Sequence, residues 1–263
     1  MIQQSSASGI GAAAATGATP EGAVDEHGAA IAVQAMFNSI APRYDLVNHV
    51  LSANIDRLWW WRTARRFRTT LADPNAEVLD ICCGTGDMTM ALLKHRPTGA
   101  RPVIAGDFAR EMLARGAYKF AGPFTRHGAA IAVEADALHL PLRDASLDLI
   151  TTAFGFRNLA NYREGLAEFH RVLRPGGQLG ILDFSEPDGL LGRIYQVYFR
   201  RVLPQIGKLI GGKDSAYNYL PSSVSKFPPP PEMLAMMREA GFTDVSWTPY
   251  TFGIAGLFVG VRN

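Results

Sequence analysis

The sequence predicts an α/β protein built on a doubly wound, mainly parallel sheet. Between about residues 78 and 184, short apolar runs alternate with helical patterns, and the connections between them are short. Alternation of this kind places helices on both faces of a parallel sheet. The first apolar run, 78–81, is followed by two glycines and a helical pattern. This is the strand, turn and helix arrangement that binds ligands in such sheets.

The composition agrees with one globular domain that has a sizeable core. Of 263 residues, 48% are hydrophobic and 19% are charged, which are ordinary fractions for such a fold. The net charge of +2 is too small to favour a nucleic-acid partner. The two cysteines, Cys82 and Cys83, are adjacent within a predicted strand and lack metal-ligand spacing, so we expect a reducing compartment and no metal. No apolar run reaches the roughly 18 residues of a membrane span.

Two N-terminal regions precede the sheet. Residues 1–30 are rich in alanine, glycine, serine and threonine and contain no lysine or arginine, so we expect a disordered tail. A helical extension, 31–70, follows and contains three consecutive tryptophans, Trp59, Trp60 and Trp61. Three such residues cannot all face one core, so we expect part of this aromatic surface to meet a ligand or a lipid. Packing on the sheet edge is the alternative for any single tryptophan.

The apolar patterns predict the remaining elements in order. Strands are expected at 78–81, 103–107, 129–135, 147–154, 178–184, 243–249 and 254–261, and helices at 87–94, 111–120 and 162–173. The last two strands are close enough to form a hairpin, which would make one strand antiparallel. An insertion, 186–231, precedes them, and insertions of this length are usually functional.

The stretch from Asp80 to Asp107 carries the ligand-binding signal. Gly84 and Gly86 lack side chains, so a ligand can approach the backbone N–H groups and the N-terminus of the next helix. Asp107 ends the next predicted strand, 23 residues after Gly84. That is about the distance at which such folds place an acid on ribose hydroxyls.

Two classes of cofactor compete for this site. A dinucleotide site requires a third glycine, and this chain has Thr89 at that position. Asp80, just before the turn, would oppose a pyrophosphate but suits a cationic ligand. The pattern D-x-x-x-G-x-G with a later acid therefore resembles the S-adenosyl-L-methionine site of class I methyltransferases. A tight turn in an ordinary α/β domain is the alternative for the motif alone.

Four segments make the resemblance more specific. They are Phe37–Asn48 with Arg57–Trp59, Leu79–Asp87, Phe154–Asn158 with Arg171–Gly177, and Leu203–Gly207 with Tyr217–Leu220 and Phe227–Pro228. With these segments, the chain from about Met36 to its C-terminus resembles the quinone-biosynthesis C-methyltransferases, which comprise demethylmenaquinone methyltransferases and 2-polyprenyl-6-methoxybenzoquinol methylases. The resemblance implies a class I, Rossmann-like methyltransferase domain, 31–263. Its mainly parallel seven-stranded sheet would contain one antiparallel strand, and 186–231 would be a lid-like insertion.

The resemblance also implies the activity. It is methyl transfer from S-adenosyl-L-methionine to a ring carbon of a polyprenylated quinol, with demethylmenaquinol as the leading acceptor. The benzoquinol precursor of ubiquinone, or activity on both rings, is the alternative acceptor. A non-catalytic binding protein on the same fold is the alternative of another class. Because the acceptor resides in the bilayer, we expect a cytoplasmic protein with peripheral contact at the inner face of the membrane, and homo-oligomerisation stays open.

The family's cofactor positions carry over residue by residue. They are Asp80, Gly84, Thr85, Gly86, Asp107, Asp136 and Ala137. By this resemblance Asp136 accepts a hydrogen bond from the adenine amine, and the Ala137 N–H donates to a ring nitrogen. One departure is Ala153, where the family often has a small hydroxyl residue. A side-chain contact from that position is therefore lost.

The catalytic residues implied by the resemblance are Arg157, Tyr44 and Asp45. Arg157 matches a family arginine thought to assist loss of the phenol proton. With a pKa above about 12, arginine is a poor base, so holding a water or stabilising the phenolate is the better role. A structural arginine that bridges strand and helix is the alternative. Tyr44 and Asp45 are expected to close over the cofactor.

The insertion supplies the expected substrate contacts. Tyr217 and Tyr219 are predicted to lie near the quinol ring. Above them, the amphipathic run 190–203 is predicted to form a membrane-facing helix, although a helix packed on its own domain would have a similar pattern.

Overall fold

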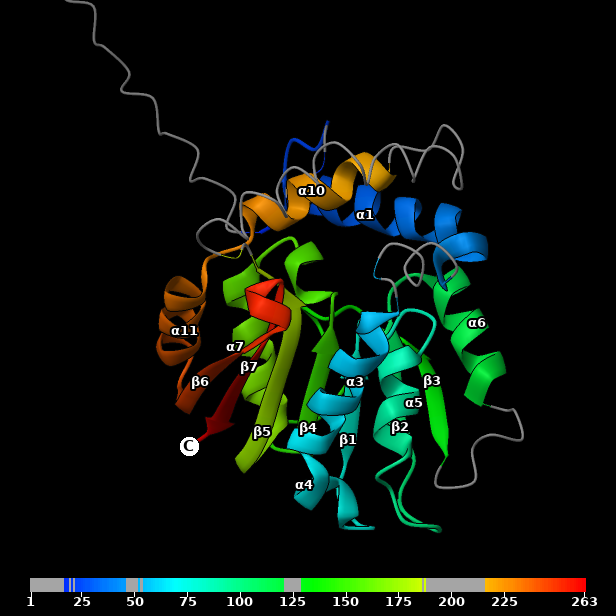
Figure 1. Ribbon diagram of the computed structural model, residues 1–263, viewed down its shortest axis with the longest axis vertical. Helices are drawn as coiled ribbons and strands as arrows, with labels where there is room; N and C mark the ends of the chain where they lie inside the picture. Colours follow the sequence, from blue (N-terminus) through cyan, green and yellow to red (C-terminus); the bar gives the residue numbers. More distant parts are fainter. Residues whose placement is uncertain are drawn as a thin grey trace, which may run out of the picture.

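The computed structural model describes residues 17–18, 20, 22–45, 52, 54–120, 129–185, 187 and 216–263, without the side chains of residues 43, 216–218 and 220. A seven-stranded sheet forms its centre, with helices on both faces (Figure 1). The strands are β1 (Val78–Ile81), β2 (Val103–Asp107), β3 (Ala130–Glu134), β4 (Leu147–Ala153), β5 (Leu173–Phe184), β6 (Phe242–Tyr250) and β7 (Ala255–Arg262). They follow the order β3-β2-β1-β4-β5-β7-β6.

The sheet confirms the predicted fold class. Strands β1 to β5 pair in parallel, and β7 runs antiparallel to both β5 and β6. The order reverses at β1, which lies between β2 and β4. In open α/β sheets, ligands bind at the carboxyl ends of the strands beside such a reversal.

Helices cover the sheet in layers. They are α1 (Glu26–Ile40), η1 (Ala41–Arg43), α3 (Ile55–Arg66), α4 (Arg68–Ala72), α5 (Asp87–Leu93), α6 (Arg110–Phe120), η2 (Phe156–Asn158), α7 (Tyr162–Val172), α10 (Ala216–Lys226), α11 (Pro230–Glu239) and η4 (Thr251–Gly253). Helices α1 and α10 lie side by side across the carboxyl end of the sheet (Figure 1). None of the helices in the described part of the chain has both the length and the apolar character that crossing a bilayer requires.

Alternate side chains of the central strands enter two different cores. Val78 and Leu149 pack with α3, α4 and α5, whereas Leu79 and Ile150 pack with α7 and α11 on the other face. All four are buried. Burial on both faces explains why these strands read as continuous apolar runs rather than as alternating patterns.

Two boundaries differ by more than one residue from those expected. Helix α1 begins at Glu26, inside the stretch for which composition predicts a tail, because Asp25 caps it by accepting a hydrogen bond from the Gly28 N–H at 2.7 Å. Strand β5 begins at Leu173 rather than at 178. Leu147 pairs with Leu173 and Leu149 with Gln178, so the residues between Leu173 and Gln178 form a bulge in the strand. Of the expected insertion, residue 186 and the predicted helix 190–203 lie outside the described residues.

A buried arginine fastens the loop that precedes β1. The guanidinium of Arg96 donates to the carbonyls of Leu71, Asp73, Pro74, Ala76 and Arg101, at 2.7 to 3.5 Å. Its side chain is buried. Carbonyls at the end of α4 and at the start of β1 thereby gain donors that the sheet and helices do not provide.

We expect Arg96→Lys to lower the free energy of unfolding by about 2 kcal/mol. Lysine keeps the charge but offers donors from one point, so it cannot reach carbonyls spread over five residues. Chemical denaturation measures the change. Arg163→Lys is the control, because Arg163 is exposed and pairs with exposed Glu239. Equal stability of parent and Arg96→Lys would contradict this role.

Candidate active site

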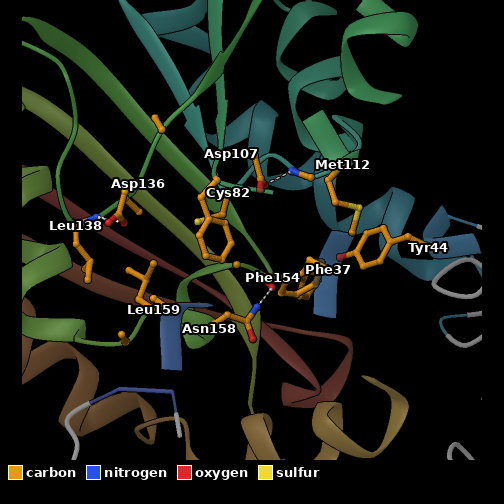
Figure 2. Close-up of a pocket in the computed structure, with 17 residues that line it drawn as sticks. Phe37, Tyr44, Cys82, Asp107, Met112, Asp136, Leu138, Phe154, Asn158 and Leu159 are labelled. Atoms are coloured by element: carbon orange, nitrogen blue, oxygen red, sulfur yellow. Dashed lines mark hydrogen bonds between the residues drawn. The ribbon is translucent and has the colours of Figure 1, made fainter. Parts of the chain in front are cut away.

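A cavity lies at the carboxyl ends of β1, β2 and β4, and α1 forms part of its wall. It encloses about 650 Å³, including the open space at its mouth. Its walls include Phe37, Tyr44, Cys82, Gly84, Asp107, Asp136, Ala137, Leu138, Phe154, Asn158 and Leu159. Figure 2 shows Asp136 and Tyr44 toward opposite ends of this cavity, with Asp107 between them. The cavity therefore occupies the place that the strand order predicts.

The turn between β1 and α5 requires its glycines. Gly84 and Gly86 have φ angles of +55° and +86°, which side chains disfavour. A Cβ on Gly86 would also lie 2.4 Å from the Phe120 ring. Gly84 lines the cavity, whereas Gly86 packs against α6 behind it. Gly84 thus forms part of the cavity wall, and Gly86 allows α6 to pack closely against the turn.

Asp80 lies beneath this turn and not on the cavity wall. Its carboxylate is fully buried and accepts hydrogen bonds from the hydroxyls of Thr89, at 2.5 Å, and Thr151, at 2.9 Å. Burial raises its pKa to about 7. Thr89 occupies the position where a dinucleotide motif has its third glycine, and here its hydroxyl binds Asp80. The predicted role of Asp80 in cofactor binding is therefore indirect in this geometry.

Asp107 joins the turn to the next helix. Its Oδ2 accepts from the Gly84 N–H at 2.7 Å, and its Oδ1 accepts from the Ala109 N–H at 2.8 Å. Burial raises its pKa to about 6. Each carboxylate oxygen can accept a second hydrogen bond. Because Asp107 lines the cavity, a ligand hydroxyl can supply that bond.

The loop after β3 forms the next part of the wall. Asp136 is exposed, and its Oδ1 accepts from the Leu138 N–H at 3.0 Å, while Oδ2 lies 3.4 Å from the Nδ1 of His139. Ala137 is buried and also lines the cavity. Of the seven predicted cofactor residues, Gly84, Asp107, Asp136 and Ala137 line the cavity; Asp80, Thr85 and Gly86 lie behind it.

A cluster of charges holds the end of the N-terminal extension over the turn. The Lys119 Nζ lies 2.7 Å from Asp45 Oδ2, 3.0 Å from Asp87 Oδ1 and 3.3 Å from Thr85 Oγ1. The Thr85 hydroxyl donates to the other oxygen of Asp45. We call Asp45, Thr85, Asp87 and Lys119 the Lys119 cluster. Its members come from three separate parts of the chain, and the sequence analysis did not identify Lys119.

Tyr44 covers the same turn. Its ring carbon Cε1 is 4.0 Å from the point where a Cβ of Gly84 would stand. The ring also makes an edge contact with Phe37, at 6.1 Å between centroids. Tyr44 therefore forms part of the cavity wall next to the residues of the Lys119 cluster, as the expectation that it closes over a cofactor requires.

Arg157 lies in the turn after β4 and is buried. Its Nη1 pairs with Asp183 Oδ1 at 2.9 Å and also donates to the Phe154 carbonyl, and its backbone N–H donates to Asp183 Oδ2 at 3.0 Å. Asp183 belongs to β5. Arg157 therefore bridges the end of β4 to β5, which resembles the structural alternative, and it is not part of the cavity wall.

Three buried polar atoms near this bridge have no hydrogen-bond partner in the described part of the chain. They are the Nε of Arg157, the Oδ1 of Asn158 and the hydroxyl of Tyr219. Burial raises the pKa of Tyr219 to about 12, with smaller opposed effects of the nearby charges of Arg157 and Asp183. An unpaired buried polar group costs about 1–3 kcal/mol. The three atoms are closed to solvent in this structure, and of the three residues only Asn158 also lines the cavity.

The predicted substrate tyrosines are only partly described. Tyr219, on α10, lies close enough to Arg157 and Asp183 to feel their charges. The side chain of Tyr217 lies outside the described residues. Three aromatic rings stand next to this region: Phe154 is 4.5 Å from Phe184 and 5.8 Å from Trp59, between centroids.

Comparisons with known proteins agree with this fold and site. A sequence model of the ubiE/COQ5 methyltransferase family matches residues 24–262. A demethylmenaquinone methyltransferase of Deinococcus radiodurans is 46% identical over 88% of this chain and 93% of its own. Another, of Thermus thermophilus, is 47% identical over 86% of this chain and 100% of its own. The ubiquinone/menaquinone biosynthesis C-methyltransferase UbiE of Geobacter sulfurreducens is 40% identical over 88% of both chains.

Solved structures share the fold at low identity. An S-adenosylmethionine-dependent methyltransferase of Thermotoga maritima, described as a possible histamine N-methyltransferase, has a TM-score of 0.60 and 17% identity over 88% of this chain and 100% of its own. The [4+2]-cyclase SpnF has a TM-score of 0.61 and 14% identity over 88% and 94%. The sheet order, the glycine turn and the acid at the end of β2 define a class I methyltransferase, whose cofactor is S-adenosyl-L-methionine. Within that class, the chain belongs to the ubiE/COQ5 methyltransferase family.

We expect Lys119→Met to raise the Kd for S-adenosyl-L-methionine severalfold, because Asp45 and Thr85 lose the cation that holds the cover on the turn. Calorimetric titration measures the Kd. A double-mutant cycle with Asp45→Asn should give a coupling free energy of about 1 kcal/mol. Arg163→Met, which breaks an exposed pair elsewhere, should leave the Kd unchanged. Strict additivity of the two single changes would contradict the proposed cluster.

Proposed function

We propose that this chain transfers the methyl group of S-adenosyl-L-methionine to a ring carbon of demethylmenaquinol. One observation of the geometry supports this most directly: the buried atoms of Arg157, Asn158 and Tyr219 lack partners among the described residues, and Asn158 also lines a cavity whose wall fits the cofactor. A quinol hydroxyl can both donate to an oxygen and accept from an N–H or O–H. The names of the relatives supply the substrate class.

The cavity wall fits the cofactor at two of its groups. The Asp107 carboxylate would accept from the ribose hydroxyls, since it lies at the end of β2 and keeps free acceptor positions. Asp136 and the Ala137 N–H would bind the adenine edge. The apolar side chains of Leu138 and Leu159 would contact the adenine ring. When bound, the cofactor supplies an electrophilic methyl group on a sulfonium sulfur.

The residues of the second region would prepare the acceptor ring. A quinol carbon is nucleophilic when a ring hydroxyl loses its proton, so a phenolate oxygen must be stabilised. The Arg157 Nε–H can donate to that oxygen while its Nη1 stays paired with Asp183. Tyr219, with a pKa of about 12, keeps its proton at neutral pH and can donate a second hydrogen bond. Preorganised donors of this kind stabilise developing charge.

The proposal extends to the range of acceptor rings, the contact with the membrane and the organisation of the chain. Activity on both rings is the second candidate, because a relative at 40% identity is named a ubiquinone/menaquinone biosynthesis C-methyltransferase, but the relatives at 46% and 47% identity are named for demethylmenaquinone alone. Peripheral contact with the cytoplasmic face of the membrane follows from a bilayer-resident acceptor. We also propose homo-oligomerisation, the division into a tail, an extension and an insertion, and the lid helix at 190–203.

The activity is tested with the purified full-length chain, S-adenosyl-L-methionine and chemically reduced acceptors. Mass spectrometry should show one added methyl group on demethylmenaquinol. 2-Polyprenyl-6-methoxybenzoquinol, assayed in parallel, decides between one and two rings. Cofactor binding without methylation of either acceptor would overturn the proposal.

The role of Asp107 predicts a pH dependence. Its pKa of about 6 in the free protein means that it becomes protonated below that pH, and a protonated carboxyl is a poorer acceptor for ribose hydroxyls. Cofactor affinity should therefore be constant above about pH 7 and fall below pH 6, by up to about tenfold per pH unit. Asp107→Asn should weaken binding at pH 8 by roughly 10- to 150-fold and remove the acidic decline. Calorimetry from pH 5 to 8 tests both, and an unchanged profile in the variant would exclude Asp107.

The role of Arg157 predicts a loss of rate without loss of binding. Arg157→Lys retains a cation beside Asp183 but loses the Nε–H and the planar fork. We expect single-turnover methylation to slow by about 100-fold, with an unchanged Kd for the cofactor. Arg174→Lys is a matched control, because Arg174 pairs with Asp148 at 2.7 Å between the same two strands, away from the cavity. A parental rate in Arg157→Lys would leave Arg157 as a purely structural bridge.

A further inference from the structure

The outer surface of α3 combines exposed apolar side chains with a concentration of arginines. Ile55, Leu58 and Trp61 are 38%, 50% and 45% exposed. Their spacing of three residues places them along one side of the helix. Large exposed apolar groups that gather in this way mark an interaction surface rather than the scattered exposure of ordinary proteins.

Helix η4 adds a fourth apolar side chain next to α3. Phe252 is 82% exposed, and its φ of 58° lies in the left-handed region that phenylalanine disfavours. The indole Nε1 of Trp59 donates to Thr251 Oγ1 at 2.8 Å, and the Arg62 guanidinium stands 4.2 Å above the ring of Tyr250. These contacts hold η4 against α3, and both lie on the viewer's side of the sheet in Figure 1. A strained turn that presents a phenylalanine to solvent fits a membrane-inserting tip.

The exposed charges of α3 and α4 are of one sign. Their arginines are Arg57, Arg62, Arg65, Arg66 and Arg68, all exposed. None of the five has an ion-pair partner among the residues that the structure describes. The single acid, Asp56, is buried. Residues 55–72 thus carry +4, against +2 for the whole chain, so the rest of the chain carries −2.

We infer that the α3–η4 surface, made of Ile55, Leu58, Trp61, Phe252 and the five arginines, docks on an anionic lipid bilayer. Basic side chains beside apolar ones are the pattern of an interfacial helix, with the arginines at the headgroups and the apolar groups at the acyl boundary. An acidic protein surface would pair with the arginines but would not take up the apolar side chains. A neutral bilayer would take up the apolar side chains but would not pair with the arginines. The inference rests partly on the proposed function, because a polyprenylated acceptor resides in the bilayer.

The position of this surface suits delivery of such an acceptor. Trp59 is buried on the side of α3 that faces the protein and packs against Phe154, a residue of the cavity wall. Phe184, which packs against Phe154 at a tilted angle, also has its ring centre 5.3 Å from the Arg157 guanidinium. Among the described residues, this aromatic layer connects Trp59 of α3 to Arg157. A ring could reach the site while its apolar tail stays at the lipid boundary.

Vesicle co-sedimentation of the full-length chain, without substrate, tests the inference. Binding should require phosphatidylglycerol in a phosphatidylcholine vesicle and should weaken with salt. Arg57→Gln with Arg65→Gln should lower the partition constant about 25-fold, at about fivefold per arginine. Leu58→Ser with Phe252→Ser should lower it by about tenfold or more. The controls, Arg110→Gln with Arg115→Gln and Ile131→Ser, change exposed residues of α6 and β3 and should bind like the parent.

Two further measurements locate the contact and test whether the variants are still folded. Brominated phosphatidylglycerol should quench tryptophan fluorescence, and Trp61→Phe should remove most of that quenching. All variants should keep cofactor affinity and the rate on a tail-less quinol, since none of these side chains lies on the cavity wall. Failure of methylation with intact vesicle binding would overturn the proposed function alone.

Three outcomes would overturn the docking surface itself. One is equal vesicle binding by the parent and the surface variants. Another is vesicle binding that does not depend on the presence of phosphatidylglycerol. The third is light scattering that shows a lipid-free dimer in the parent and a monomer in Leu58→Ser with Phe252→Ser, which would make the surface an interface between two copies of the chain.

Discussion

The hydrogen bonds of one buried carboxylate, Asp80, underlie the whole site. Through Thr89 and Thr151 it joins β1 to α5 and to β4, the three elements that surround the glycine turn. An acid in this position is costly to ionise, as its raised pKa shows, and it is tolerated because both oxygens are paired. The turn above it is then held from a second side by Asp107. The two acids thus act from below and beside the backbone that the cofactor must approach.

The site divides into two chemically different regions. The region around Asp107 and Asp136 has acceptors at the ends of β2 and β3, which suit hydroxyl and amine groups. In the proposed function, the buried donors of Arg157 and Tyr219, with the Phe184 ring beside Arg157, would stabilise an oxyanion on a flat ring. The β4–η2 turn, through Asn158, belongs to both. Methyl transfer needs this juxtaposition, because the donor and acceptor must be aligned within one enclosed space.

Much of this architecture could be predicted from local patterns, since each strand of the central sheet is a short apolar run and the glycine turn follows β1 directly. The start of α1 was also available locally, because Asp25 has the chemistry of a helix cap. Pairings across long separations could not be predicted. Lys119 reaches Asp45 only because α6 and the N-terminal extension meet over the turn, and no spacing in the sequence encodes that meeting. Likewise, the pattern around Asp80 could not reveal that its side chain points into the core.

The Lys119 cluster has a kinetic consequence. Tyr44 covers Gly84, and Asp45 is bound on both of its oxygens, so Asp45 can move away from the turn only after those bonds break. Spent cofactor must leave after every cycle. We therefore expect opening of the Lys119 cluster to limit turnover. We also expect the enzyme to be more sensitive to accumulation of the demethylated cofactor than to the supply of fresh S-adenosyl-L-methionine.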